Sequence, residues 1–381
     1  MRKFWNKRTI LSLLISLSAV VLTILIILFA QGYSFSPKTK KVEKTGLLVL
    51  TSAPNGASIY INGHLTDATN TTMKLTPGTY EVEIKKEGYI PWKKKLTVAE
   101  GLVTAADAVL FPALPELRPL TFFGVFSPVL SPDGTKIAFK TNEKEKAGIW
   151  ILNMAQKPLS FSKRVYQTVK DTKEVHFSEG EISWSPDGEN LLVSFEEGKT
   201  VFLLNPNLTA EKQKPVDITP TLEIVQAKWE EEKRKEEEVL LDLLPDYLKK
   251  IATESAKKAV WSPGGKKFLY QTEDGTAKVF DPKWEQFPPR EQKEKKGKVF
   301  ELPKALDYLW LPGGKNGHVI LVEKDKISIV ESEGTNKAIV YGGEFEENFV
   351  APWPDGSKLV ILTSLNKPAG TPPSLYTISL R

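Results

Sequence analysis

The longest uninterrupted hydrophobic stretch runs from Ile10 to Ala30 without a charged residue, a glycine or a proline. At the rise of an α-helix these residues span about 30 Å, the thickness of the hydrocarbon core of a bilayer. We therefore expect a transmembrane helix over residues 9–30. A cleaved signal peptide, cut after Gly32, is the alternative, although the apolar core of such a peptide usually has only about 7 to 15 residues.

Basic residues flank this stretch on both sides. Four lysines follow it between residues 38 and 44, and four basic residues precede it more closely: Arg2, Lys3, Lys7 and Arg8. The positive-inside rule then favours a cytoplasmic N-terminus. We expect a cytoplasmic stub at 1–8, a single-pass anchor in the cell membrane, a polar linker at 31–45, and the rest of the chain outside the cytoplasm.

Residues 46–98 alternate β-branched or aromatic residues with polar ones, and turn signals recur every 8 to 12 residues. In residues 79–84, for example, Tyr80, Val82 and Ile84 share one face of an expected strand. This pattern is typical of a small β-sandwich. The pair Asn62 and Gly63 tolerates positive φ and therefore favours a tight hairpin.

The same segment resembles a PEGA domain. The residues that carry the resemblance are the Pro-Xaa-Gly-Ala turn and the surrounding turn and strand positions: Pro54, Asn55, Gly56, Ala57, Gly46, Val49, Ile59, Ile61, Asn62, Gly63, Pro77, Gly78, Tyr80, Gly88 and Tyr89. The sequence departs from the family at 66–71. The resemblance implies a non-catalytic extracytoplasmic module of prokaryotic surface proteins over residues 46–111, which a Pro-rich linker at 112–120 would follow.

A Ser-Pro-Asp-Gly-like motif recurs five times in the remaining chain. Its prolines are 54, 77, 49 and 42 residues apart, at positions 132, 186, 263, 312 and 354. A third β-strand follows each motif, at 148–152, 201–204, 278–280, 327–330 and 375–378. The set resembles TolB-type β-propeller repeats, whose four-stranded blades need about 40 to 50 residues. We expect an all-β chain in which 121–381 form a propeller of about five blades, closed by pairing of 375–380 with 121–126.

Two sets of repeated side chains invite a functional interpretation. Asp133, Asp187 and Asp355 could form a carboxylate ring, but a turn role is the better prediction because Gly264 and Gly313 take that place in two repeats. Three tryptophans could stack on sugars, but packing between blades is favoured for Trp184, Trp261 and Trp310.

The 77-residue interval holds a predicted helical insertion at 223–258. Its leucines must be buried, either in a solvated helical hairpin that caps one propeller face or against a partner. From the sequence we expect that removal of the insertion leaves a folded, anchored protein that has lost most of its affinity for a partner.

Charge and composition exclude several functions. Residues 1–44 carry a charge of +7, from eight basic residues and one acid, whereas the rest holds 44 basic against 46 acidic residues, so that the net charge is +5. This distribution argues against nucleic-acid binding. The chain has no cysteine, and its three histidines lie in unrelated contexts, at His64, His176 and His318.

No catalytic motif, cofactor motif or metal-ligand cluster is found, so no catalytic, cofactor or metal residue is assigned and the binding residues stay unknown. The leading interpretation is a membrane-anchored, non-catalytic binding or scaffold protein of the cell surface. Its propeller would engage a protein or an envelope polymer such as a polysaccharide. The alternatives are a propeller hydrolase that acts on envelope glycans, which would need a pair of acids at a defined separation, and a structural envelope component.

Overall fold

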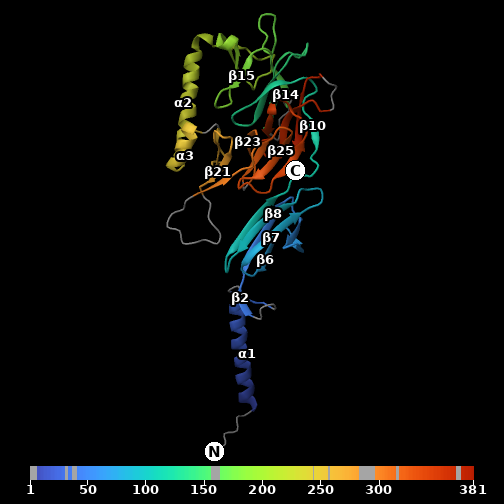
Figure 1. Ribbon diagram of the computed structural model, residues 1–381, viewed down its shortest axis with the longest axis vertical. Coiled ribbons are helices and arrows are strands. Elements are labelled where there is room, and N and C mark those ends of the chain that lie inside the picture. Colours follow the sequence, from blue (N-terminus) through green and yellow to red (C-terminus); the bar gives the residue numbers. More distant parts are fainter. Residues whose placement is uncertain are drawn as a thin grey trace, which may run out of the picture. The chain divides into compact units, whose positions relative to one another are not determined.

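The computed structural model describes residues 7–30, 33–36, 41–155, 164–242, 244–255, 258–282, 297–314, 317–365 and 370–381 (Figure 1). These residues form two compact units, which divide between Leu110 and Phe111. Each unit is described by itself below.

The first unit begins with α1 (Lys7–Ala30). Over Ile10–Ile27 this helix is long and apolar enough to cross a membrane, and none of that window is buried. By length and composition it therefore qualifies as a membrane anchor or as a signal sequence. The expected linker at 31–45 is not wholly irregular, because β1 (Tyr33–Ser36) pairs antiparallel with β2 (Lys41–Lys44).

A two-sheet sandwich makes up the rest of this unit. One sheet has the order β6-β3-β9 and consists of β3 (Gly46–Ala53), β6 (Thr71–Leu75) and β9 (Val103–Val109). The other has the order β5-β4-β7-β8 and consists of β4 (Ser58–Ile61), β5 (His64–Ala68), β7 (Gly78–Lys85) and β8 (Trp92–Val98). Alternate side chains point into a shared core that includes Leu48, Ile59, Ile84 and Trp92. The period-two pattern thus produces the predicted sandwich.

Five four-stranded antiparallel sheets form the second unit, and each is one propeller blade. Blade 1 has β11 (Phe126–Leu130), β12 (Lys136–Thr141), β13 (Gly148–Asn153) and β14 (Val165–Lys170). Blade 2 has β15 (Glu181–Trp184), β16 (Leu191–Phe195), β17 (Thr200–Leu204) and β18 (Val216–Asp217). Blade 3 has β19 (Lys258–Trp261), β20 (Phe268–Gln271), β21 (Ala277–Asp281) and β22 (Lys298–Glu301). Blade 4 has β23 (Asp307–Leu311), β24 (His318–Val322), β25 (Lys326–Glu331) and β26 (Ala338–Gly342). Blade 5 has β27 (Val350–Pro352), β28 (Lys358–Thr363), β29 (Ser374–Ser379) and, from the N-terminal side, β10 (Leu117–Pro119).

The two ends of the propeller chain close blade 5. The predicted participation of the C-terminal strand is confirmed, but its partner is β10 and not residues 121–126. The expected Pro-rich linker therefore contains the closing strand. Residues 121–125 still contact β29 and the residue before it through single bonds, from the Thr121 N–H to the Leu375 carbonyl at 3.4 Å and from the Val125 N–H to the Pro373 carbonyl at 2.9 Å. Their irregular path explains the difference, because β11 begins only at Phe126.

Blade 1 shows how neighbouring blades pack. Ile137 and Phe139 of β12 join a buried cluster with blade 5, whereas Ala138, on the opposite face, joins a cluster with blade 2. Since successive residues of a strand face opposite sides, each blade has one face for the preceding blade and one for the following blade.

The helical insertion contains α2 (Leu222–Leu241), α3 (Asp246–Lys250) and a π-helical turn, η3 (Ile251–Ser255). The start of α2 packs on blade 2 through Leu222, Val225 and Trp229. Its other end and α3 pack on blade 3, where Leu244 and Leu248 are buried. The predicted helices are thus present, but they lie against the sides of two blades instead of capping one propeller face as a hairpin.

Candidate functional site

The carboxylates of the repeat motif belong to turns. In blade 1 the Ser131 hydroxyl donates to Asp133 Oδ1 at 2.5 Å, and the Thr135 N–H donates to the same oxygen at 3.1 Å. In blade 2, Ser185 and Glu189 make the same two bonds to Asp187. The hydroxyl bonds help to hold the pKa of both carboxyl groups below the usual value, against the opposing effect of burial at Asp133. The turn interpretation is confirmed.

Two of the three repeated tryptophans join neighbouring blades. The Trp184 indole N–H donates to the carbonyl of Val129 in blade 1 at 3.1 Å, and Trp310 donates to Val260 in blade 3 at 3.1 Å. These contacts confirm packing between blades for this pair. Trp261 differs, since it packs against Phe268 and against the cluster that contains α3.

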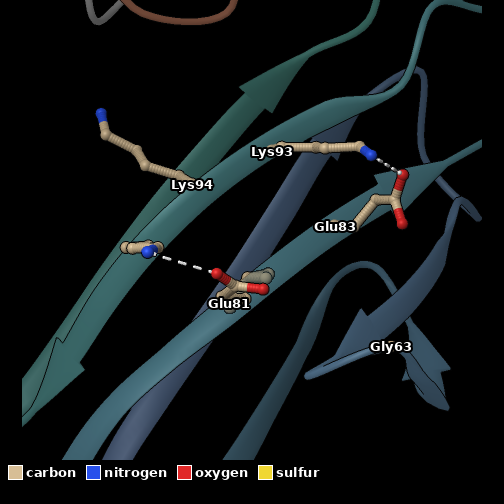
Figure 2. A pocket seen from close by; sticks show the side chains of 7 residues that line it. Gly63, Glu81, Glu83, Lys93 and Lys94 are labelled. Carbon is tan, nitrogen blue, oxygen red and sulfur yellow. Dashed lines mark ion pairs between the residues drawn. The ribbon is translucent and has the colours of Figure 1, made fainter.

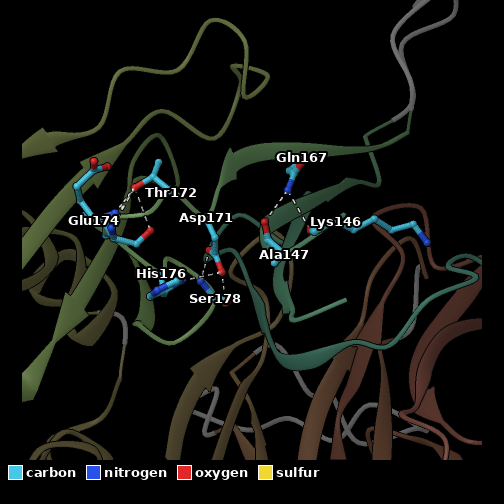
Figure 3. A network of polar contacts seen from close by, with 9 residues as sticks. Lys146, Ala147, Gln167, Asp171, Thr172, Glu174, His176 and Ser178 are labelled. Carbon is cyan, nitrogen blue, oxygen red and sulfur yellow. Dashed lines mark hydrogen bonds and ion pairs between the residues drawn. The ribbon is translucent and has the colours of Figure 1, made fainter. Parts of the chain in front are cut away.

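The opposite end of the propeller carries the loops that join the second strand of a blade to the third and one blade to the next. We call this the loop end, and we call the end with the repeat motifs the turn end. Between blades 1 and 2 a polar network holds two of these loops together (Figure 3). The Gln167 amide donates to the carbonyls of Lys146 and Ala147 at 2.9 and 3.0 Å. Gln167 lies in β14, so these bonds tie the loop between β12 and β13 to a strand of the same blade. The Asp171 N–H, in the loop between the two blades, donates to the same Ala147 carbonyl at 3.1 Å and joins the two loops.

The same network holds an Asp, a His and a Ser close together. Ser178 donates its hydroxyl to Asp171 Oδ2 at 2.5 Å and its N–H to Oδ1 at 2.9 Å. His176 lies with Nδ1 3.9 Å from Asp171 Oδ2, and its side chain is mostly exposed (Figure 3). In a catalytic triad the serine hydroxyl bonds to the histidine. Here the Ser178 hydroxyl bonds to Asp171 instead, so these contacts stabilise the loop between β14 and β15.

Backbone strain is concentrated at the loop end. Ser127, Glu196 and Glu347 have φ of 46°, 47° and 55°, in the left-handed region that residues with a Cβ usually avoid. Each costs about 1 to 3 kcal/mol, and such residues cluster at ligand clamps and switch regions. No sequence pattern predicted positive φ at these positions.

A half-buried lysine lies near two of these strained loops. Lys140 of β12 donates to the Gly180 carbonyl at 3.0 Å. Burial lowers the pKa of its ammonium group, although Glu347 and Glu181 act in the opposite sense. The loop end therefore brings together charges of both signs, and this mixture suits polar recognition better than a pair of converging acids does.

The sandwich has a hollow of its own on the outer face of β7 and β8, with a volume of about 320 Å³ (Figure 2). Glu83 accepts from Lys93 at 2.9 Å, and Lys95 pairs with Glu81 at 3.3 Å. Glu83 also pairs with Lys85 at 2.9 Å, and the two lysines lower its pKa despite the opposing effect of burial. Lysines of β7 and β8 thus neutralise the charges of both glutamates, so the hollow has the character of a solvated sheet surface.

Each of the three histidines lies in a different element or loop. His64 is exposed in β5, and His318 is buried in β24 with its ring 5.8 Å from that of Phe111, edge to face. Within the described residues, no group of three or more His, Asp or Glu side chains is arranged to hold a metal ion.

Comparisons with known proteins agree with this division of the chain. Residues 45–113 match the PEGA domain family, so the sandwich is a PEGA domain. No curated protein matches the chain.

Among solved structures, TolB from Acinetobacter baumannii is 15% identical, with coverage of 79% of this chain and 59% of that chain and a TM-score of 0.24. The β-propeller domain of Cps50 (Swd1) from Myceliophteria thermophila is 11% identical, covering 68% and 73%, with a TM-score of 0.21. Hsv2 from Kluyveromyces lactis is 12% identical, covering 84% and 72%, with a TM-score of 0.20. The chain thus spans 59% of the TolB chain's length. The assignment as a propeller rests on the five four-stranded sheets themselves.

Proposed function

We propose that this protein is a non-catalytic binding protein of the cell surface, which α1 anchors in the membrane with the PEGA domain and the propeller outside the cytoplasm. Its loop end would bind a protein or an envelope polymer. The observation that carries the proposal is the combination, in one chain, of a fully exposed apolar helix, a PEGA domain and a propeller. The concentration of strained residues at the loop end supports the choice of binding face.

The lowered pKa values of several carboxyl groups support a role without catalysis. The pKa values of several carboxyl groups are shifted downward, as at Asp187, Asp274 and Glu323. A glycan hydrolase needs one carboxylic acid whose pKa is raised, so that it is protonated when the leaving group departs. These three carboxyl groups do not meet this requirement, because their pKa values are lowered.

Cysteine labelling in intact cells tests the topology, because the chain has no cysteine of its own. Thr66→Cys in the PEGA domain and Glu189→Cys in the propeller introduce exposed thiols, and Lys3→Cys serves as the cytoplasmic control. A membrane-impermeant maleimide should label the first two before lysis and the control only after lysis, all on the full-length chain. Labelling of the first two only after lysis, or a shorter product that begins near Tyr33, would contradict the anchored topology.

A further inference from the structure

The junction between blades 2 and 3 differs from its neighbours at equivalent repeat positions. In blade 1, Ile137 and Ala138 lie six and seven residues after the motif serine, and they face the preceding and the following blade, respectively. The equivalent of Ala138 in blade 2 is Leu192, which packs against α2 and not against a blade 3 residue. The blade 2 face that should meet blade 3 is therefore covered by a helix.

In blade 3, too, residues of the insertion take the place of a contact with the neighbouring blade. Phe268, the equivalent of Ile137, should face blade 2 but packs with Leu244 and Leu248 of the insertion. Leu269, the next residue, faces blade 4 as the repeat requires. The position of Trp261 is consistent with this arrangement, because it lies in the cluster that the helices cover. Its repeat equivalents Trp184 and Trp310 bond to the preceding blade.

The helix that links these two covered faces is exposed to solvent between its two packed ends. Every described side chain from Glu230 to Val239 is exposed. Four ion pairs at i,i+4 spacing run along α2: Lys228–Glu232 at 3.8 Å, Lys235–Glu231 at 2.7 Å, Lys233–Glu237 at 3.7 Å and Arg234–Glu238 at 2.8 Å. A helix that is polar on all sides and carries such pairs is typical of a solvated bridge. Figure 1 shows α2 running beside the blades toward α3.

We infer that α2 and α3 replace the direct interface between blades 2 and 3, so that the propeller opens at this junction and α2 is the strut that sets its width. The junctions between blades 5 and 1, between blades 1 and 2, and between blades 3 and 4 hold the blades together through shared side-chain packing. At the junction between blades 2 and 3, the distance between the blades depends on α2, a 20-residue helix that is about 30 Å long.

Distances between pairs of spin labels test the inference on the full-length protein in lipid nanodiscs. Glu189→Cys and Lys266→Cys occupy equivalent turn positions in blades 2 and 3, and Thr135→Cys with Glu189→Cys gives the control pair in blades 1 and 2. Lys233→Pro breaks α2 where no side chain packs on it, and Lys233→Ala removes the same ion pair while the helix stays intact.

The distance distribution between blades 2 and 3 should be broader than that of the control pair. In Lys233→Pro its maximum should move by about 5 Å or more, one helical turn, while the control pair and the Lys233→Ala protein stay unchanged. A distribution for blades 2 and 3 that is as narrow as the control and unaffected by proline would overturn the inference. Broadening of both pairs by Lys233→Pro would also overturn it, because the blades would then not be separable at this junction.

Discussion

Trp310 of blade 4 donates its indole N–H to the carbonyl oxygen of Val260 in blade 3 at 3.1 Å. Trp184 makes the same bond to Val129, one blade before it. A side chain at a fixed place in the repeat thus ties a blade to its predecessor, and the bond joins residues far apart in the sequence.

Replacement of this tryptophan should be costly even when an aromatic ring is kept. Trp310→Phe removes the indole N–H that donates to the Val260 carbonyl, and Val260 is partly exposed to solvent. The loss should therefore be about 0.5 to 1.5 kcal/mol, the net contribution of a typical hydrogen bond. Chemical denaturation of the full chain should show this loss in the propeller transition. Trp184→Phe is the matched variant with the same expected effect, and an unchanged midpoint in both would refute the role given to the indole bond.

Closure of blade 5 depends on a buried threonine. Thr121 is 2% exposed, and its hydroxyl accepts from the Leu375 N–H at 3.0 Å. Thr121→Val keeps the shape of the side chain but leaves the Leu375 N–H without this acceptor. The free energy of unfolding should therefore fall by about 1 to 3 kcal/mol.

Amide hydrogen exchange provides the readout for this variant, with exchange of β29 expected to accelerate before that of β13. Thr79→Val, at an exposed hydroxyl pair of the PEGA domain, should leave the propeller unchanged. Equal acceleration in all five blades would show that closure is not local to this contact.

The structure changes the expectation that the insertion can be removed without harm. Leu248 is fully buried against blade 3, where it covers Phe268, Tyr270 and Phe280. Leu248→Ala should lower the free energy of unfolding by about 2 to 5 kcal/mol, through lost burial and the cavity left behind. Val239→Ala, on the exposed part of α2, should change it by less than about 0.5 kcal/mol. Similar values for the two variants would mean that α3 does not cover blade 3.

Acid should weaken the hairpin between β20 and β21. The Thr272 hydroxyl donates to Asp274 at 2.5 Å, and this bond and those from Thr276 lower the pKa of Asp274 to about 2. Because the folded-state pKa is below the ordinary value of 3.8, this carboxylate stabilises the fold above that value, and its contribution is lost as the pH falls toward about 2. In Asp274→Asn the melting temperature should therefore depend less on pH between 4 and 2 than in the unmodified protein. Identical pH profiles would contradict the assigned bonds.

The repeats predicted the blades because each motif forces a turn between two strands, whatever the rest of the blade contains. The strand Leu117–Pro119 was missed because it is short and contains a proline, and it pairs only with a segment about 260 residues away. The leucines of the insertion indicated burial, but helical periodicity does not say which surface covers Leu244 and Leu248. The strain at Ser127 and Glu347 left no signal, since neither is the glycine or asparagine that usually marks positive φ.

The most direct test of the proposed function is photo-crosslinking in intact cells at the two ends of the propeller. A photoactivatable residue at Lys144 or Lys173 lies at the loop end, and one at Glu189 or Lys266 lies at the turn end, all in exposed positions. The account predicts a discrete species of higher mass from the loop-end positions and none from the turn-end positions. Crosslinks from the turn end alone, or none at either end, would contradict a binding propeller that works through its loop end.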